Sequence, residues 1–340
     1  MDALGQTELR SDERVMFFPT LGWKRGGAWH LEIHGWVYEP ETRPLIEATL
    51  RHALGLSDDE LTEKGKAVFS ERARFFLVDN ERRKRVSIEL AGNVYRLARS
   101  EANGHFTEKL ELAGMLLTRM VETNRIASFR PAESMEPAPI GEVHLLEDHG
   151  LSVISDIDDT IKISQVRDRD ALVKNTFVRP FQPIPEMAAL YQSWAGKFGA
   201  QFHYVSASPW QLYPALAGFT RSNGFPAGTF HLKQFRVKDE SFFDLFASPE
   251  RYKPGVIEPM LRRFPNRRFV LVGDSGEKDP EIYGAIARKF PRQIAAILIR
   301  NVTAEEPASV RYRNAFRGLP AEQWAIFKDP SKMLNWSLPR

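Results

Sequence analysis

Residues 151–299 alternate short apolar runs with stretches of helical length, and this alternation limits the possible folds more than any other feature of the chain. The runs Leu151–Ile157 and Arg268–Val272 lack the strict apolar–polar alternation of a half-buried strand. Such runs suit a parallel sheet that is covered on both faces. Stretches such as Glu186–Lys197 and Pro280–Phe290 are long enough for the covering helices. The pattern predicts a doubly wound α/β domain.

An acidic segment follows the first of these runs. It reads Asp156-Ile157-Asp158-Asp159-Thr160, so three carboxylates fall within four positions at the end of a strand. Two unit charges about 4 Å apart repel by roughly 4 kcal/mol at an effective dielectric near 20. The cluster therefore requires a cation, altered pKa values or full exposure. A solvated acidic loop is the simpler interpretation of this segment taken alone.

Further polar residues follow other apolar runs. Ser206 ends the run at Phe202–Val205, and Gly273-Asp274 ends the run at Phe269–Val272. In sheets of this kind ligands bind beyond the carboxyl ends of the strands, so we expect these side chains to meet at one edge. Each also has an ordinary interpretation. Asp279 suits a helix N-cap, Ser206 a helix start and Lys253 an exposed surface.

Taken in order, these residues resemble the motifs of the haloacid dehalogenase superfamily of phosphotransferases. Those motifs are DxDx[TV], a strand ending in Ser or Thr, a Lys, and GDxxxxD. Within the superfamily, four strings resemble the actin-patch-associated phosphatidate phosphatase family over about residues 143–303. They are SDIDDTIK (155–162), YVSASPWQLYP (204–214), FHLKQF (230–235) and LVGDSGEKDPEIY (271–283).

The resemblance implies a Mg²⁺-dependent phosphatase acting on a phosphatidate-type substrate. Asp156 would be the nucleophile and Asp158 the general acid and base, with Lys253 as the third catalytic residue. Residues expected to bind the metal ion are Asp156, Asp158 (through its carbonyl), Asp274 and Asp279. Residues expected to bind the substrate are Thr160, Ser206 and Lys233, where Lys233 has a surface position as its equal alternative.

The first third of the chain has a different character. In Trp29–His34 apolar and polar residues alternate, as in a half-buried strand, and Arg43–Leu54 has helical spacing. Three prolines within residues 130–140 indicate a linker. We predict a β-rich accessory domain with a helical insertion at 1–140. A haloacid-dehalogenase-like, Rossmann-like catalytic domain with a small cap would follow at 141–340.

Composition narrows the functional classes. The 340 residues contain no cysteine, so disulfides, thiolate metal sites and a cysteine nucleophile are excluded. The net charge of +3 and the absence of basic motifs interleaved with aromatics argue against a nucleic-acid partner. No apolar stretch reaches about 18 residues, and the N-terminus is polar, so we expect a cytoplasmic protein that is peripheral at membranes.

The sequence does not decide the identity of the substrate. A rim of aromatic side chains that dips into lipid would favour phosphatidate, although a place in the core is at least as good an interpretation of each. These aromatic residues are Trp210, Tyr213, Phe219, Phe235, Phe242 and Phe243. The alternatives are a soluble phosphomonoester or a phosphoprotein as substrate, or a non-catalytic lipid- or protein-binding module. The GDSG string also occurs in serine proteases, but here it lies between a strand and a helix.

Overall fold

A computed structural model describes residues 8–41, 44–57, 61–114, 117, 125–234 and 249–334. The chain forms two compact units. One is built from the residues up to 46 and from 74–148, and the other from 47–73 and from 149 onward.

The second unit contains a six-stranded sheet in which every neighbouring pair is parallel. Its order is β12-β11-β10-β13-β14-β15. Counted along the chain this is 3-2-1-4-5-6, the order of a doubly wound sheet, so the predicted parallel α/β architecture is confirmed. The strands are β10 (Leu151–Ser155), β11 (Gln201–Pro209), β12 (Gly228–Lys233), β13 (Arg268–Asp274), β14 (Ile294–Arg300) and β15 (Trp324–Phe327).

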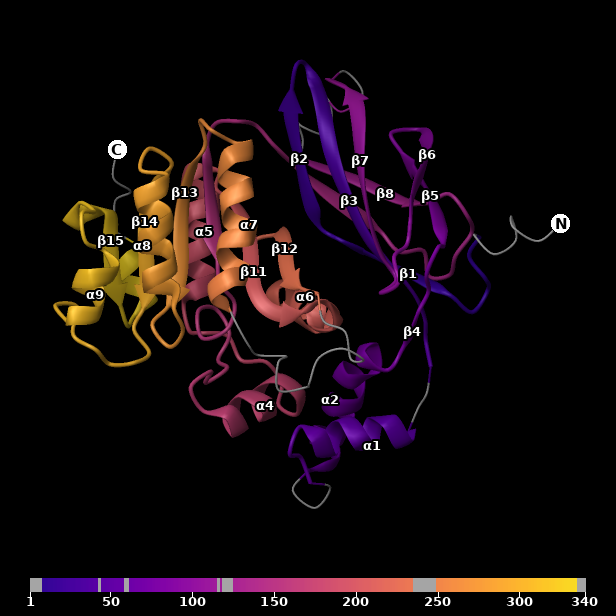
Figure 1. Ribbon diagram of the computed structural model, residues 1–340, viewed down its shortest axis with the longest axis horizontal. Helices are drawn as coiled ribbons and strands as arrows, with labels where there is room; N and C mark the ends of the chain where they lie inside the picture. Colours follow the sequence, from indigo (N-terminus) through magenta and orange to yellow (C-terminus); the bar gives the residue numbers. More distant parts are fainter. Residues whose placement is uncertain are drawn as a thin grey trace. The chain divides into compact units, whose positions relative to one another are not determined.

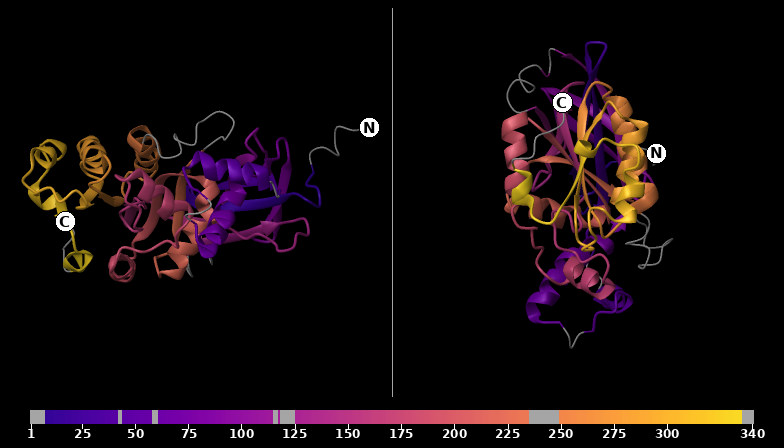
Figure 2. Two further views of the ribbon diagram at one scale, coloured as in Figure 1. Left: turned by 90° about the horizontal axis from the view of Figure 1, so that it is seen from below. Right: turned by 90° about the vertical axis from the view of Figure 1, so that its left-hand side faces the viewer.

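Helices cover both faces of this sheet, as the right-hand view of Figure 2 shows. Helix α8 packs against β13 and β14 and is flanked by α7 and α9. In β14 every residue except the terminal Arg300 is buried, which explains its continuous apolar sequence. The helices are α4 (Arg169–Phe177), α5 (Met187–Phe198), α6 (Tyr213–Ser222), α7 (Pro249–Arg263), α8 (Asp279–Lys289) and α9 (Val310–Ala315). Short 3-10 turns lie at Trp210–Leu212, Ala321–Gln323 and Pro330–Met333.

Helix α7 begins at Pro249, one turn before Lys253. Pro254 therefore lies inside the helix, where its missing N–H removes one backbone hydrogen bond. Lys253 lies one turn in and is fully buried.

A helical hairpin from the first third of the chain groups with the second unit. It consists of α1 (Pro44–Ala53) and α2 (Glu63–Ala73), and α2 packs on α4 (Figure 1). The observed division differs from the predicted boundary at 140/141 in two places. The hairpin belongs to the second unit, and residues 141–148 belong to the first. The latter residues include β9, which pairs with β2 and β8 of the first unit.

The first unit is a β structure in which β3 is central and pairs with four other strands. Alternate residues of β3 are buried, as the pattern at 29–34 predicts. The core contains Phe17, Trp29, Leu31, Phe106 and Phe129. The strands are β1 (Arg14–Phe18), β2 (Thr20–Arg25), β3 (Ala28–Glu39), β4 (Asp79–Asn80), β5 (Arg85–Leu90), β6 (Asn93–Arg99), β7 (His105–Ala113), β8 (Ile126–Pro131) and β9 (Gly141–Leu146), with a 3-10 turn at Arg74–Phe76.

Candidate active site

Asp156 directly follows β10, and its backbone N–H donates to Val272 of the neighbouring strand at 2.9 Å. The chain then turns tightly, because the N–H groups of Ile161 and Lys162 both donate to the carbonyl of Ile157 at 3.0 Å. This turn brings the Thr160 hydroxyl to 3.0 Å from Oδ2 of Asp156, to which it donates. The side chain of Asp156 is buried and fixed at the carboxyl edge of the sheet.

Two further carboxylates converge on Asp156. Asp274 ends β13, Asp279 begins α8, and oxygen atoms of these three residues lie within 4.8 Å of one another. Oδ1 of Asp274 accepts a hydrogen bond from Gly276. Its Oδ2 is buried and has no hydrogen-bond partner among the described residues. Three clustered carboxylates with an unsatisfied, buried oxygen fit a hard divalent cation such as Mg²⁺.

The pKa values of the clustered carboxyl groups are consistent with a cation site. Burial raises the pKa of Asp156 well above its ordinary value. The pKa of Asp274 is likewise raised, first by burial and then by the charge of Asp279. Both carboxyl groups therefore resist ionisation together, and a bound cation would reverse this effect.

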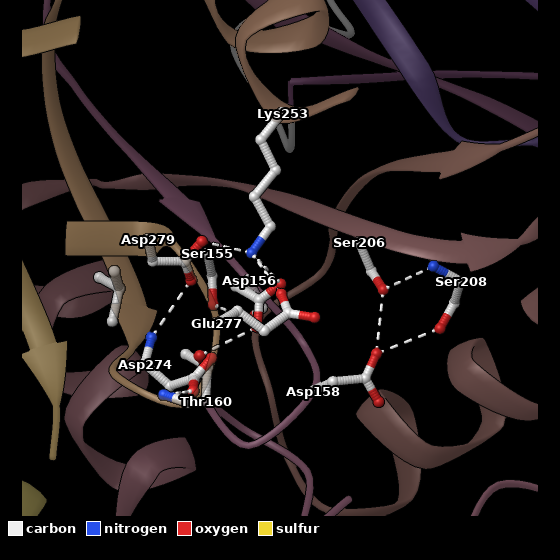
Figure 3. A network of polar contacts seen from close by, with 12 residues as sticks. Ser155, Asp156, Asp158, Thr160, Ser206, Ser208, Lys253, Asp274, Glu277 and Asp279 are labelled. Atoms are coloured by element: carbon white, nitrogen blue, oxygen red, sulfur yellow. Dashed lines mark hydrogen bonds and ion pairs between the residues drawn. The ribbon is translucent and has the colours of Figure 1, made fainter. Parts of the chain in front are cut away.

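Lys253 reaches into the cluster from α7 (Figure 3). Its ammonium lies 2.9 Å from Oδ1 of Asp156 and 3.1 Å from Oε2 of Glu277, and it also contacts Oδ1 of Asp279. Burial alone would lower the pKa of Lys253, but the carboxylates, Asp156 foremost, hold the pKa well above its ordinary value. Lys253 is thus a permanently charged group beside the predicted nucleophile, and not the surface residue of the alternative interpretation.

Asp158 points away from this cluster, toward β11 (Figure 3). Its Oδ2 accepts hydrogen bonds from Ser206 at 3.0 Å and Ser208 at 3.1 Å. Its Oδ1 lies 2.8 Å from Nζ of Lys162 and accepts from Ser164 at 2.7 Å. Burial would raise the pKa of Asp158, but Lys162 and the hydroxyl donors outweigh burial and lower the pKa to about 2. Asp158 is therefore held as a carboxylate.

The structure brings most of the predicted residues together and adds four. Thr160 contacts Asp156 and Ser206 contacts Asp158, whereas Lys233 ends the edge strand β12, two strands from β10. Sequence reasoning missed four residues that contact the site, and all but Ser164 lie inside a quoted motif string. They are Lys162, Ser164, Ser208 and Glu277.

The aromatic residues that the structure describes do not form the predicted lipid-facing rim. Trp210 is 6% exposed and Phe219 is 4% exposed, because both pack into the core of the second unit. Tyr213 is partly buried and packs edge-on against Phe230. The other three aromatic residues of the predicted rim, at 235, 242 and 243, lie outside the described residues.

A cavity of about 670 Å³ opens near the site. Asp159, which directly follows Asp158, lines it together with Arg300 at the end of β14. The side chains of Ile163 and Ile184 give it an apolar part, and those of Gln165, Arg167, Asp168 and Asn301 a polar part. Asp156 and Asp274 are not among its lining residues, so the cavity offers space beside the carboxylate cluster and does not contain it.

A doubly wound parallel sheet with buried carboxylates and a lysine at its carboxyl edge defines a candidate metal-dependent phosphatase domain. Residues 151–301 match the family model described as phosphatidate phosphatase APP1, catalytic domain. This match, over less than half of the chain, confirms the resemblance predicted from the motifs. All the catalytic and metal-binding candidates lie within it.

Two curated relatives each match about half of the chain. Phosphatidate phosphatase APP1 of Saccharomyces cerevisiae is 38% identical over 168 residues, which are 48% of this chain and 28% of the yeast protein. An uncharacterised protein of Schizosaccharomyces pombe is 33% identical over 172 residues, which are 49% of this chain and 28% of that protein. The aligned part therefore spans less than a third of each relative.

Proposed function

We propose that the chain is a Mg²⁺-dependent phosphomonoester hydrolase that acts through an aspartyl-phosphate and whose substrate is phosphatidate. The observation that carries this proposal is the buried convergence of Asp156, Asp274 and Asp279, with one oxygen of Asp274 unsatisfied. The haloacid-dehalogenase type of the fold belongs to the same proposal and is supported by the order of the motifs along the parallel sheet.

In the first step, a carboxylate oxygen of Asp156 attacks phosphorus. The new P–O bond forms as the bond to the substrate alcohol oxygen breaks, and a proton passes to that oxygen. Thr160 holds the Asp156 side chain in one orientation for attack. Bound Mg²⁺, held by Asp156, the carbonyl of Asp158, and Asp274, would offset the repulsion between the phosphate and the carboxylates.

Asp158 serves as the acid and then as the base. Its carboxylate form, which Lys162 stabilises, suits the second step, in which it takes a proton from the water that hydrolyses the aspartyl-phosphate. For the first step Asp158 takes a proton from solvent as the anionic phosphate enters, and it passes this proton to the leaving alcohol oxygen. Ser206 turns its hydroxyl from Asp158 to a phosphoryl oxygen. Lys253 stabilises the charge that develops on the phosphoryl group.

Asp279 supports Lys253 in this scheme. One of its oxygens contacts the Lys253 ammonium, and the other accepts a hydrogen bond from the backbone N–H of Asp274 at 3.2 Å. These contacts leave Asp279 beside the metal site, where it orients the lysine and the loop that carries Asp274.

The lipid substrate is supported by the names of the matched family and of the yeast relative. The cavity lined by Asp159 and Arg300 supplies room near the carboxylate cluster for a substrate larger than a simple phosphate ester. No helix within the described ranges is long and apolar enough to cross a membrane. Because the proposed substrate is a membrane lipid, we propose that the protein acts at a membrane surface, bound peripherally from the cytoplasm.

Phosphate release tests the proposal. The protein with Mg²⁺ should release phosphate from phosphatidate in mixed micelles and, more slowly, from an aryl phosphate. Asp156→Asn should abolish both activities, whereas Asp170→Asn, an exposed change on α4, should leave them unchanged. Equal turnover by wild type and Asp156→Asn would reject the nucleophile. A preference for soluble phosphate esters or phosphoproteins would reject the lipid, and no turnover with retained vesicle binding would indicate a non-catalytic module.

A further inference from the structure

The helical hairpin of α1 and α2 lies outside the segment that matches the catalytic family, yet it packs on the catalytic unit. The rings of Phe69 in α2 and Phe177 in α4 lie 6.1 Å apart, measured between their centroids. A Cβ atom added to Gly65 would lie 2.9 Å from Cγ1 of Val178. The two segments approach so closely that α2 requires a glycine at this position.

Arg72 of α2 is buried in this contact, with 7% of its surface exposed. Its Nη1 donates a hydrogen bond to the carbonyl of Thr176. Its Cζ lies 3.7 Å from the centroid of the Phe181 ring, which is a close cation–π contact. Both partners belong to the segment between β10 and β11. Contacts with the catalytic unit therefore replace the water that would otherwise solvate the guanidinium.

The same phenylalanine ring leads to the catalytic site. Nζ of Lys162 lies 4.8 Å from the centroid of Phe181, and Lys162 is 1% exposed. That ammonium is also the group 2.8 Å from Oδ1 of Asp158. A continuous series of contacts therefore leads from α2 to the predicted acid and base. It runs through Arg72, Phe181, Lys162 and Asp158.

We propose that Arg72 is a positioning residue for Asp158, acting through Phe181 and Lys162, and that the hairpin of α1 and α2 supports the segment between β10 and β11 from outside the catalytic site. This inference rests on the proposed hydrolase function. A lysine ammonium on its four-carbon stem can take many positions, and the face of a fixed ring restricts them. Arg72 fixes the ring. Without Arg72, Phe181 can turn, Lys162 shifts, and the Asp158 carboxylate loses the orientation that proton transfer requires.

Steady-state kinetics separates positioning from binding. In Arg72→Ala we expect kcat to fall by about tenfold while KM stays within about twofold, because Ser206 and Lys253 are unaffected. Arg51→Ala is the matched control, since Arg51 lies 5.9 Å over Phe69 in the same hairpin. Its kcat should stay within about twofold of wild type. A wild-type kcat in folded Arg72→Ala, checked by circular dichroism, would overturn the inference.

A double-mutant cycle tests the route through the ring. If Arg72 acts through Phe181, the variant carrying both Arg72→Ala and Phe181→Leu should lose about as much kcat as Phe181→Leu alone. Losses that multiply would show that Arg72 acts by another route.

A spectroscopic readout keeps the inference independent of turnover. The ¹⁵N–¹H signal of the Lys162 ammonium, assigned with Lys162→Arg, should shift or broaden in Arg72→Ala and not in Arg51→Ala. An unmoved signal in Arg72→Ala rejects the coupling. If wild type releases no phosphate from any substrate, the proposed function fails, and this signal still decides whether Arg72 positions Lys162.

Discussion

The ammonium of Lys253 lies 2.9 Å from Oδ1 of Asp156, and both side chains are buried at the carboxyl edge of the parallel sheet. This contact joins α7 to the loop that follows β10, two segments nearly a hundred positions apart in the chain. Burying two opposite charges is costly, and the pair persists because Glu277 and Asp279 also surround the ammonium. The contact therefore links the stability of the catalytic unit to its chemistry.

Lys253→Met should both abolish phosphate release and destabilise the second unit. Removing the cation leaves the buried Asp156 and Asp279 and the partly buried Glu277 uncompensated, a change that typically costs about 3–5 kcal/mol. Denaturant unfolding with and without Mg²⁺ measures this, and added Mg²⁺ should restore part of the stability. The control Lys289→Met removes an exposed lysine from the end of α8 and should cost less than about 1 kcal/mol. Equal unfolding of wild type and Lys253→Met would contradict the ion-pair interpretation.

Asp274→Asn should weaken Mg²⁺ binding by at least about tenfold, because it removes a charged ligand. Without Mg²⁺ the same variant should be more stable than wild type. The raised pKa of Asp274 means that its ionised form is unfavourable in the folded state, and asparagine is neutral. Isothermal titration calorimetry and thermal unfolding check the two parts. Unchanged Mg²⁺ affinity would remove Asp274 from the metal site.

Acidification should destabilise the first unit between about pH 6.5 and pH 4. Burial lowers the pKa of both His105 and His144 to about 4, from an ordinary value of 6.5. The unfolded chain therefore binds more protons in this interval, and stability falls as the pH drops, by up to about 3 kcal/mol for each histidine. Unfolding titrations at several pH values measure the slope. His105→Phe should reduce it, and a slope that His105→Phe leaves unchanged would exclude His105 as a cause.

Gly273→Ala should inactivate the enzyme without changing a charged residue. An added Cβ would lie 2.2 Å from Oδ2 of Asp279, so Asp279 must move and Lys253 with it. We expect kcat to fall by about a hundredfold. Gly218→Ala in α6 is the control, because nothing lies within 4 Å of its added Cβ, and it should stabilise the helix by about 0.5–1 kcal/mol. Full activity in Gly273→Ala would show that the position of Asp279 is not critical.

Several features of the site were predictable because they depend on strand ends. In a parallel sheet the carboxyl ends of the strands meet at one edge, so Asp156 and Asp274 had to approach one another once β10 and β13 were neighbours. Glu277 was missed because a charged residue inside a loop motif gives no sign of its direction. Lys162 was missed because its partner, Asp158, depends on how tightly the loop turns.

The amino-acid sequence by itself determined the parallel α/β architecture and the carboxylates and lysine available for catalysis, since both follow from local pattern and order along the chain. Only the tertiary structure decided that the hairpin of α1 and α2 packs on the catalytic unit, that Asp158 turns toward Ser206 and Ser208, and that Trp210 is buried. The reason is physical. Local pattern reports which residues need burial or a charge partner, while the choice among many similar partners depends on packing between segments far apart in the chain.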